Sequence, residues 1–405
     1  MAAVLSTSGA AARVVVLTAA VVVAVAAAAA TADASATATD AARGGYAYPR
    51  GCPPPPPPVI SERGPIADRP ALSTLLAGSY TVPGGEAIPG IPPNLSLACG
   101  NTLPGTDHTI VCGPGWPLGG LILEPPARGG GGGGGRRGRP TASIVFLHGV
   151  IGRPQLYLLA LSGLIQSDPT WWATVRLVVP VAPVYKDFLV PLVDETFHPG
   201  LRYAWHDPSG TDAVRRTAGG ADVPTAEALR RAGASGVAED VAGMAASAAR
   251  IDAIVCGEAA AVGSSRCGGG DGCRNCESPP PIVLLGHVRG GTAALAVGLL
   301  GGAPLAGIVS LWGSTPLLPY AARHGVSALS AAPTCFRAVV AAASTGGDPA
   351  ALADARLAAA MWTQLYGPRG VRAVDFGVNS EAATVLALPA LQKKVMDAIK
   401  GVLGA

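Results

Sequence analysis

A tight turn between an apolar strand and an apolar helix is the part of this sequence best suited to chemistry. The strand candidate Ile282–Leu285 runs into the turn Gly286–Gly291 (GHVRGG), and an apolar helix follows. This is the frame of the G-x-S-x-G turn, whose glycines permit a sharp bend that lifts the central residue to the sheet edge. A serine at that position attacks carbonyl carbons. Here the central residue is Val288, which has no lone pair and cannot attack.

A relocated triad is an alternative that the remaining side chains leave open. His148 and His287 lie near the predicted sheet edge, and the nearby serines are Ser310, Ser314 and Ser344. None of these serines lies in a glycine-framed turn, and a lone histidine near a pocket is more often structural. We therefore favour the loss of the nucleophile over its relocation.

A cluster of cysteines precedes the strand of the turn. Its members are Cys256, Cys267, Cys273 and Cys276. The Cys-x-x-Cys spacing also suits a structural zinc site, and unpaired thiols are a third alternative. We expect disulfides among these four and no metal, because the start of the chain resembles an export signal and disulfides persist outside the cytosol.

Short apolar segments alternate with helical patterns along residues 111–405. As strands buried on both faces we expect Leu121–Leu123, Ser143–Leu147, Val175–Val179, Ile282–Leu285, Ile308–Trp312, Ala338–Ala343 and Val371–Phe376. Residues 237–254 and the segment from Pro389 have helical spacing, and proline favours a first helical turn. The alternation predicts an α/β fold with a mostly parallel sheet covered by helices on both faces.

The amino-terminal segments look different from this domain. Residues 1–36 contain an apolar run at 14–30 followed by small residues, which predicts a cleaved signal peptide. A membrane anchor that keeps contact through 14–30 and an organelle transit peptide are the alternatives. Residues 37–110 are rich in Pro and Gly and predict an irregular lead-in. The chain is therefore expected in the secretory pathway, secreted or membrane-anchored.

Bulk composition excludes few functions. The chain has 405 residues, 49% of them hydrophobic, which is enough for a large core. Its formal net charge of +3 is too small to argue for a nucleic-acid partner. A tract of consecutive glycines at 129–135 interrupts the domain, and we expect it to be a long loop joining two adjacent strands of one sheet.

The ordered motifs of the domain resemble the phospholipase/carboxylesterase group of α/β-hydrolases, which includes the acyl-protein thioesterases. The segments that carry this resemblance are Phe146–Gly149 (FLHG), Val179–Val184, Trp205–Asp207, Leu284–Thr292, Leu305–Leu311 and Gly347–Pro349. The sequence departs from the family by insertions at 129–139, 208–232 and 256–280. The resemblance implies an α/β-hydrolase fold and no cofactor.

The resemblance also assigns the family's functional positions. Val288 replaces the nucleophile, Asp348 keeps the position of the acid, and Ser380 stands nearest to the position of the base. The last histidine of the chain is His324, so no later residue can supply the base. The oxyanion hole uses backbone N–H groups, which the resemblance places at Val150 and Arg289. The Arg289 side chain points either to the pocket mouth or to solvent, and we favour solvent.

These assignments predict a hydrolase-fold protein without serine-hydrolase catalysis. Such a protein could still bind an acyl or lipid-like small molecule, or another protein. An active ester or thioester hydrolase with a non-standard nucleophile is the alternative. A decayed sequence or an incorrect gene prediction is the third.

Overall fold

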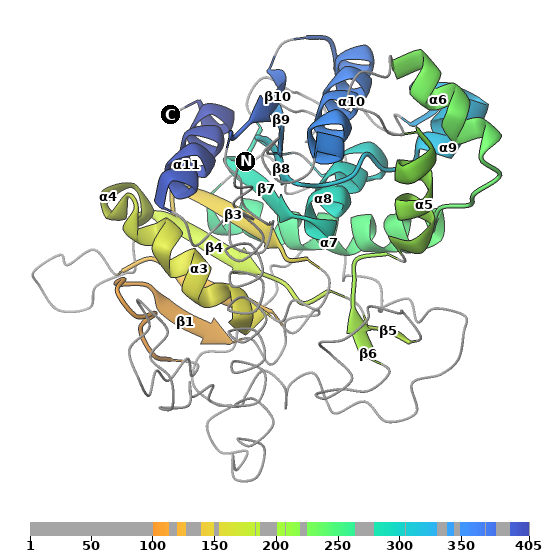
Figure 1. Ribbon diagram of the computed structural model, residues 1–405. Coiled ribbons are helices and arrows are strands. Elements are labelled where there is room, and N and C mark those ends of the chain that lie inside the picture. Colours follow the sequence, from red (N-terminus) through yellow and green to blue (C-terminus); the bar gives the residue numbers. More distant parts are fainter. Residues whose placement is uncertain are drawn as a thin grey trace, which may run out of the picture.

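The computed structural model describes the domain with gaps. It covers residues 100–112, 120–126, 139–149, 154–182, 184–186, 201–206, 208–218, 225–263, 279–303, 305–329, 338–343, 349–368, 370–377 and 389–404. Figure 1 shows a central sheet with helices around it. Two short strands, β5 (Val184–Lys186) and β6 (Leu201–Tyr203), pair separately from that sheet.

The main sheet has eight strands in the order β1-β2-β4-β3-β7-β8-β9-β10. They are β1 (Thr109–Cys112), β2 (Leu121–Glu124), β3 (Ala142–Leu147), β4 (Val175–Val179), β7 (Ile282–His287), β8 (Gly307–Leu311), β9 (Ala338–Ala343) and β10 (Val371–Asp375). β2 is antiparallel to both of its neighbours, β1 and β4, and the other neighbouring pairs of this sheet are parallel. This strand order, with the second strand reversed, is the α/β-hydrolase fold.

The predicted strands are confirmed, with shifts of a residue or two at their ends. One expectation about their pairing is wrong. The strands on either side of the glycine tract belong to one sheet, but they are not adjacent, because β4 lies between β2 and β3. The chain between β2 and β3 therefore does not join neighbouring strands, and residues 129–135 lie outside the described ones.

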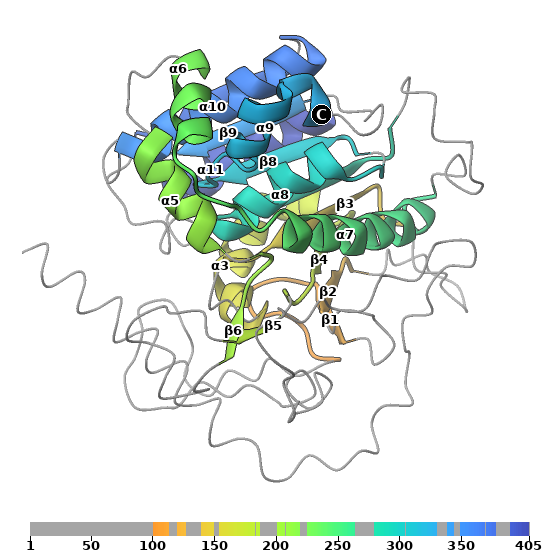
Figure 2. The ribbon, with the colours of Figure 1, turned by 90° about the vertical axis from the view of Figure 1, so that its right-hand side faces the viewer.

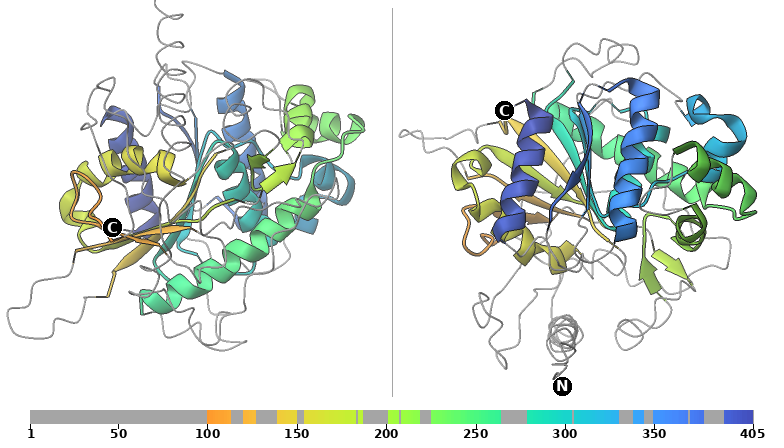
Figure 3. Two further views of the ribbon diagram at one scale, coloured as in Figure 1. Left: turned by 90° about the horizontal axis from the view of Figure 1, so that it is seen from below. Right: turned by 45° about the horizontal axis from the view of Figure 1, so that its top comes forward.

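The two faces of the sheet are covered by different helices. The bounds are α3 (Pro154–Gln166), α4 (Pro169–Trp172), α5 (Pro208–Ala218), α6 (Thr225–Ala234), α7 (Val241–Ala261), α8 (Arg289–Leu300), α9 (Leu318–His324), α10 (Pro349–Tyr366) and α11 (Pro389–Leu403). Figure 3 shows α3 and α11 on one side of the sheet and α7 on the other. In Figure 2, α7 and α8 lie side by side, and they are in contact.

Alternation along the strands builds a core on each face. In β3, Val145 and Leu147 belong to one buried cluster, whereas Ile144 and Phe146 belong to the other. This follows from the period of two in a strand. The first cluster includes residues of α7, α8 and α10, and the second includes residues of α3, α4 and α11.

Local signals set the helix ends. Helix α11 begins at Pro389, as expected, and buries Leu391 and Ile399 on one face. Helix α7 begins at Val241, later than the predicted 237, because the Asp240 side chain caps it by accepting a hydrogen bond from Gly243 N–H at 2.8 Å.

The packed domain extends before residue 111, where we expected it to begin. Leu103 and Ile110 are fully buried in the core beside α3. The segment at 208–232 contributes two helices, α5 and α6, and the beginning of the segment at 256–280 continues α7.

Within the part of the chain that the structure describes, no helix has the length and hydropathy to cross a bilayer. Residues 14–30 and the rest of the expected signal and lead-in up to residue 99 lie outside the described residues.

Candidate functional site: the turn at Val288

Val288 has the backbone conformation of a nucleophile although its side chain is inert. It lies between β7 and α8, with φ 52° and ψ −109°. Its N–H donates to Leu311 O at 2.7 Å, and its carbonyl accepts from Thr292 N–H at 3.1 Å. A positive φ is a genuine outlier for a β-branched residue and costs on the order of 1–3 kcal/mol. The surrounding turn therefore holds Val288 in this strained conformation.

Close backbone packing explains the glycines of the turn. A Cβ on Gly286 would lie 2.1 Å from Gly290 O, and a Cβ on Gly290 would lie 1.8 Å from Leu147 O. Only glycine fits at both positions. The close approach of α8 to the end of β3 therefore depends on the backbone and not on the residue at position 288.

His148 connects the motifs that carry the family resemblance. Ala182 N–H donates to His148 Nε2 at 3.0 Å, and Trp205 Nε1 donates to His148 O at 2.9 Å. A backbone N–H can only donate, so Nε2 is the acceptor and Nδ1 carries the proton. Nδ1 then donates to Gly149 O at 2.8 Å. Burial lowers the pKa of His148 to about 4, so this histidine is neutral and is occupied as a structural link.

Tyr157 lies beside the segment that follows β3, close to the turn at Val288. Its hydroxyl accepts a hydrogen bond from Gly149 N–H at 3.1 Å. The place that a Cβ on Gly149 would occupy is 3.0 Å from Tyr157 Oη and 3.7 Å from Val288 Cβ. Burial raises the pKa of Tyr157 to about 12. The phenol therefore keeps its proton, and among the described residues that proton has no acceptor.

Arg289 supplies one expected oxyanion N–H and a side chain that sequence reasoning misplaced. Its N–H has no acceptor in the described part of the chain. Its guanidinium pairs with Asp212 of α5, and both side chains are partly buried, at 18% and 27% exposure. The expectation that Arg289 points to solvent is therefore wrong, because its side chain is largely buried against Asp212.

Helix α5 carries further contacts to this region. Arg215 pairs with Asp354 of α10 at 2.6 Å. A Cβ on Gly210 would lie 2.2 Å from Ala238 O, so α5 packs closely on the chain before α7. The next residue, Glu239, has a pKa that burial raises to about 7, and the N–H groups of Leu317 and Leu318 with the Thr211 hydroxyl offset this only in part.

Several assigned positions lie outside the described residues. They are Val150, Asp348 and Ser380. Asp348 directly precedes α10 and falls in the segment after β9, and Ser380 falls in the segment between β10 and α11. Their roles remain those that the resemblance implies.

The cysteine cluster is only partly described. Cys256 lies on α7 and is not a free thiol. Cys267, Cys273 and Cys276 lie outside the described residues. Pairing among the four cysteines therefore stays a prediction.

The alternative triad gains no support from the described residues. Ser310 is 1% exposed and its hydroxyl faces the glycines Gly291 and Gly313, beneath the start of α8. Ser314 is also buried. His287 is buried with its ring edge-on to Tyr157, at 5.8 Å between centroids. Ser344 lies outside the described residues.

Sequence reasoning missed Tyr157, Asp212 and Glu239. None of them belongs to a motif of the resembled family, and two lie in or next to the segment that we read as an insertion. Only their burial and neighbours in the folded chain identify them.

Comparisons with known proteins find similar solved structures whose sequence identity to this chain is low. No protein-family model and no curated protein matches the sequence. Among solved structures, Arabidopsis thaliana SOBER1 is 16% identical, covering 65% of this chain and 99% of its own, with a TM-score of 0.41. Zea mays acyl-protein thioesterase 2 is 15% identical, covering 70% and 98%, with a TM-score of 0.38. Esterase PE8 is 17% identical, covering 65% and 94%, with a TM-score of 0.40.

These neighbours are similar to this chain at a level too low to carry a functional argument. The assignment of the fold rests instead on the order and direction of the strands. What the chain does has to be argued from its own turn and the groups around it.

Proposed function

We propose that this α/β-hydrolase-fold protein has lost serine-hydrolase catalysis and binds an acyl compound at the turn around Val288. The observation that carries the proposal is the conformation of Val288. Its φ of 52° and ψ of −109° present a side chain where a nucleophile would stand, and that side chain is two methyl groups. A valine cannot form the covalent intermediate.

The lack of a base strengthens the first half of the proposal. No histidine follows His324 in the sequence, and both ring nitrogens of His148 are occupied. Loss of nucleophile or base in a triad costs on the order of 10⁶ in turnover. Oxyanion stabilisation and binding alone leave roughly 10³–10⁴ over water.

Two hydrogen-bond donors near the turn support the second half of the proposal, which is the binding of an acyl compound. The Arg289 N–H and the Tyr157 hydroxyl proton have no acceptor among the described residues. Tyr157 is held by Gly149, which follows β3 and lies close to Val288, because a Cβ on Gly149 would be 3.7 Å from Val288 Cβ. Two donors beside an inert side chain suit a carbonyl or carboxylate oxygen, which they would bind without chemistry.

The proposal is tested by measuring turnover and binding on the same protein. We expect p-nitrophenyl butyrate hydrolysis at the level of a heat-denatured sample, and binding of decanoic acid stronger than that of decanol by isothermal titration calorimetry. Tyr157→Phe should weaken the acid by about tenfold, since a hydrogen bond to a charged group contributes roughly 1.5–3 kcal/mol, and should leave decanol unchanged. Hydrolysis with saturation kinetics would favour the alternative, an esterase with a non-standard nucleophile. Equal binding of acid and alcohol would contradict the oxygen-binding role.

We propose in addition that the mature protein is exported and that Cys256, Cys267, Cys273 and Cys276 pair among themselves. The apolar run at residues 14–30 and the grouping of the four cysteines within 21 residues of the sequence support this. Thiol titration of the denatured, unreduced protein tests it. Free thiols at all four positions would rule out the pairing, and stoichiometric zinc would favour a metal site.

A further inference from the structure

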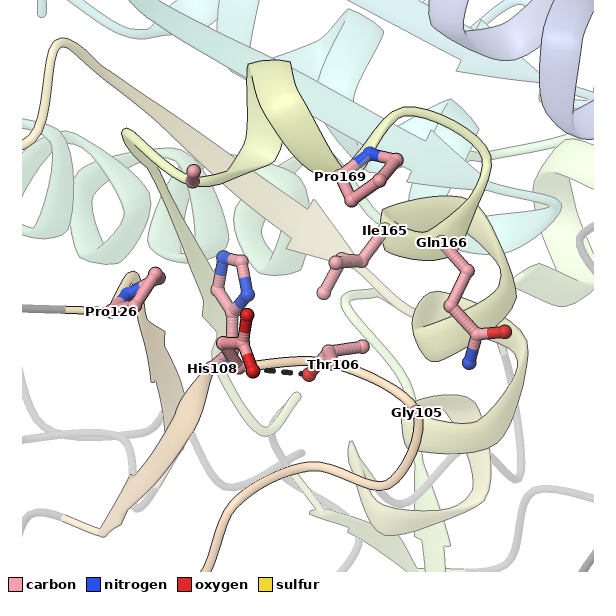
Figure 4. Close-up of a pocket in the computed structure, with 9 residues that line it drawn as sticks. Gly105, Thr106, His108, Pro126, Ile165, Gln166 and Pro169 are labelled. Carbon is pink, nitrogen blue, oxygen red and sulfur yellow. Dashed lines mark hydrogen bonds between the residues drawn. The ribbon is translucent and has the colours of Figure 1, made fainter.

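A separate cavity lies at the edge of the sheet opposite to Val288. Val288 follows the end of β7, whereas Ala173 precedes the start of β4, which runs in the same direction. Figure 4 shows the cavity between the turn before β1, the end of α3 and the start of α4. It has a volume of about 330 Å³ and is lined by Gly105, Thr106, Asp107, His108, Pro126, Ile165, Gln166, Pro169 and Ala173. This volume is at the lower end of the range for small-molecule sites.

His108 places a hydrogen-bond acceptor in the cavity wall. The residue is 2% exposed, and its Nε2 lies 3.3 Å from Val175 O. A carbonyl oxygen only accepts, so Nε2 carries the proton and Nδ1 has a lone pair. Nδ1 is buried and has no partner among the described residues. In Figure 4 the imidazole stands beside Thr106 and Ile165, within the group of lining side chains.

The protonation state of His108 is fixed by its surroundings. Burial lowers the pKa of the imidazole, and the carbonyls of Val175 and Trp172 and the charge of Asp107 offset this only in part. At neutral pH the ring is therefore uncharged and its Nδ1 accepts. A buried acceptor without a partner is destabilising, and a hydrogen-bond donor of a ligand would remove that cost.

The other polar groups of the cavity also favour a donor. The Thr106 hydroxyl is occupied, since it donates to Leu103 O at 2.8 Å and accepts from His108 N–H at 3.2 Å. Asp107 adds an exposed carboxylate. The carboxyl end of α3 forms one wall at Ile165 and Gln166 and adds no cation there. No lysine or arginine is among the residues that line this cavity.

We propose that this cavity binds a small primary amine as its ammonium ion, with the ammonium group against His108 Nδ1 and the Asp107 carboxylate. The apolar side chains of Pro126, Ile165 and Pro169 accommodate a short alkyl group. An anion would meet the Asp107 carboxylate without a compensating cation among the lining residues. A metal ion would find too few ligands, because no group of three or more metal-ligating side chains occurs in the described part of the chain.

The experiment compares probes of one length and different charge on the full chain. n-Butylammonium, butyrate and 1-butanol are titrated at neutral pH and followed by saturation-transfer NMR and calorimetry. Ligand efficiency for so few atoms predicts a Kd of roughly 1–10 mM for butylammonium. Butanol should bind more weakly and butyrate not measurably. Butyrate binding as well as butylammonium, or no butylammonium binding at about 50 mM, would overturn the proposal.

Variants distinguish butylammonium binding in the cavity from a general effect of the charge of the protein. His108→Phe keeps an aromatic ring near Trp172, whose ring centroid lies 6.4 Å away, and should weaken butylammonium by about tenfold. Asp107→Asn should weaken it by about threefold, because the carboxylate is exposed and screened. Glu227→Gln, which removes an exposed carboxylate on α6, is the control and should change nothing. Unchanged binding in both cavity variants would overturn the proposal, and the exposed Asp107→Asn keeps the test valid if His108→Phe lowers stability.

Discussion

The turn at residues 286–291 contains Val288, and helix α5 is joined to this turn through Asp212 and Arg289. Different forces hold the turn and the helix in place. The turn is fixed by backbone atoms, with no room for a Cβ on Gly286 or Gly290. Helix α5 also packs closely at Gly210 on Ala238 O, but its links to the turn and to α10 are side-chain charges, Asp212 to Arg289 and Arg215 to Asp354. The backbone contacts of the turn thus do not involve the side chain at position 288, whereas the two ion pairs of α5 depend on individual side chains.

This difference explains how a chain can keep the geometry of a nucleophile without the nucleophile. The hydrogen bonds from Val288 N–H and Thr292 N–H are made by backbone atoms and do not use the side chain at position 288. Catalysis, in contrast, needs particular side chains at particular positions. A chain can therefore keep the geometry of the turn after it has lost the catalytic side chains. Four predictions test which contacts maintain this geometry.

The largest effect is expected for Gly290→Ala. Its Cβ would lie 1.8 Å from Leu147 O, and neither backbone can retreat without moving β3 or α8. We expect a loss of more than about 3 kcal/mol in the free energy of unfolding, or no soluble protein. Gly302→Ala is the control, because nothing lies within 4 Å of its Cβ. Equal stability of the two variants in urea would show that the turn is not fixed by backbone packing.

The next effect concerns Glu239, next to the point where α5 packs. Its folded pKa of about 7 lies above the value of about 4.3 for an unfolded glutamate. The folded state therefore holds a proton that the unfolded state releases. The unfolding free energy should fall by up to about 3 kcal/mol as pH rises from about 4.5 to 7.

Glu239→Gln should remove this fall and leave the variant more stable than the parent above pH 7. Urea unfolding at several pH values measures it. Glu227→Gln, at a carboxyl that is exposed and paired with Arg230 and Arg231, should keep the pH dependence of the parent. A Glu239→Gln profile with the same slope as the parent would refute the assigned pKa.

A third prediction restores the missing side chains. Val288→Ser alone should not raise p-nitrophenyl acetate turnover, because no histidine would activate the hydroxyl. Val288→Ser with Ser380→His should exceed the single variant by at least about 10²-fold, the usual contribution of a general base. A gain from Val288→Ser alone would mean that another base already faces the turn.

The smallest effect is expected at the α5 ion pair. Arg289→Gln and Asp212→Asn should each cost about 1 kcal/mol or less, because both side chains are partly exposed. The double variant should cost less than the sum of the single variants, and salt should reduce the coupling. Additive losses in a double-mutant cycle would argue against a direct pair.

Sequence patterns predicted the strands, the strand-to-helix turn and the final helix because each depends on local periodicity and glycine placement. They did not predict that β4 lies between β2 and β3, because strand pairing is a long-range choice that a glycine-rich loop leaves open. Val288 and Arg289 were placed correctly at the turn. The partner of Arg289 could not be found, since Asp212 is 77 residues away on a segment without a matching motif.

The central claim is tested most directly by covalent labelling. The folded protein is incubated with an excess of a fluorophosphonate probe, and its intact mass is measured beside that of an active serine esterase. Our account predicts no adduct on this protein, because valine and not serine occupies the nucleophile position of the turn. A stoichiometric adduct that maps to one serine, and that is lost when that serine is replaced by alanine, would contradict it.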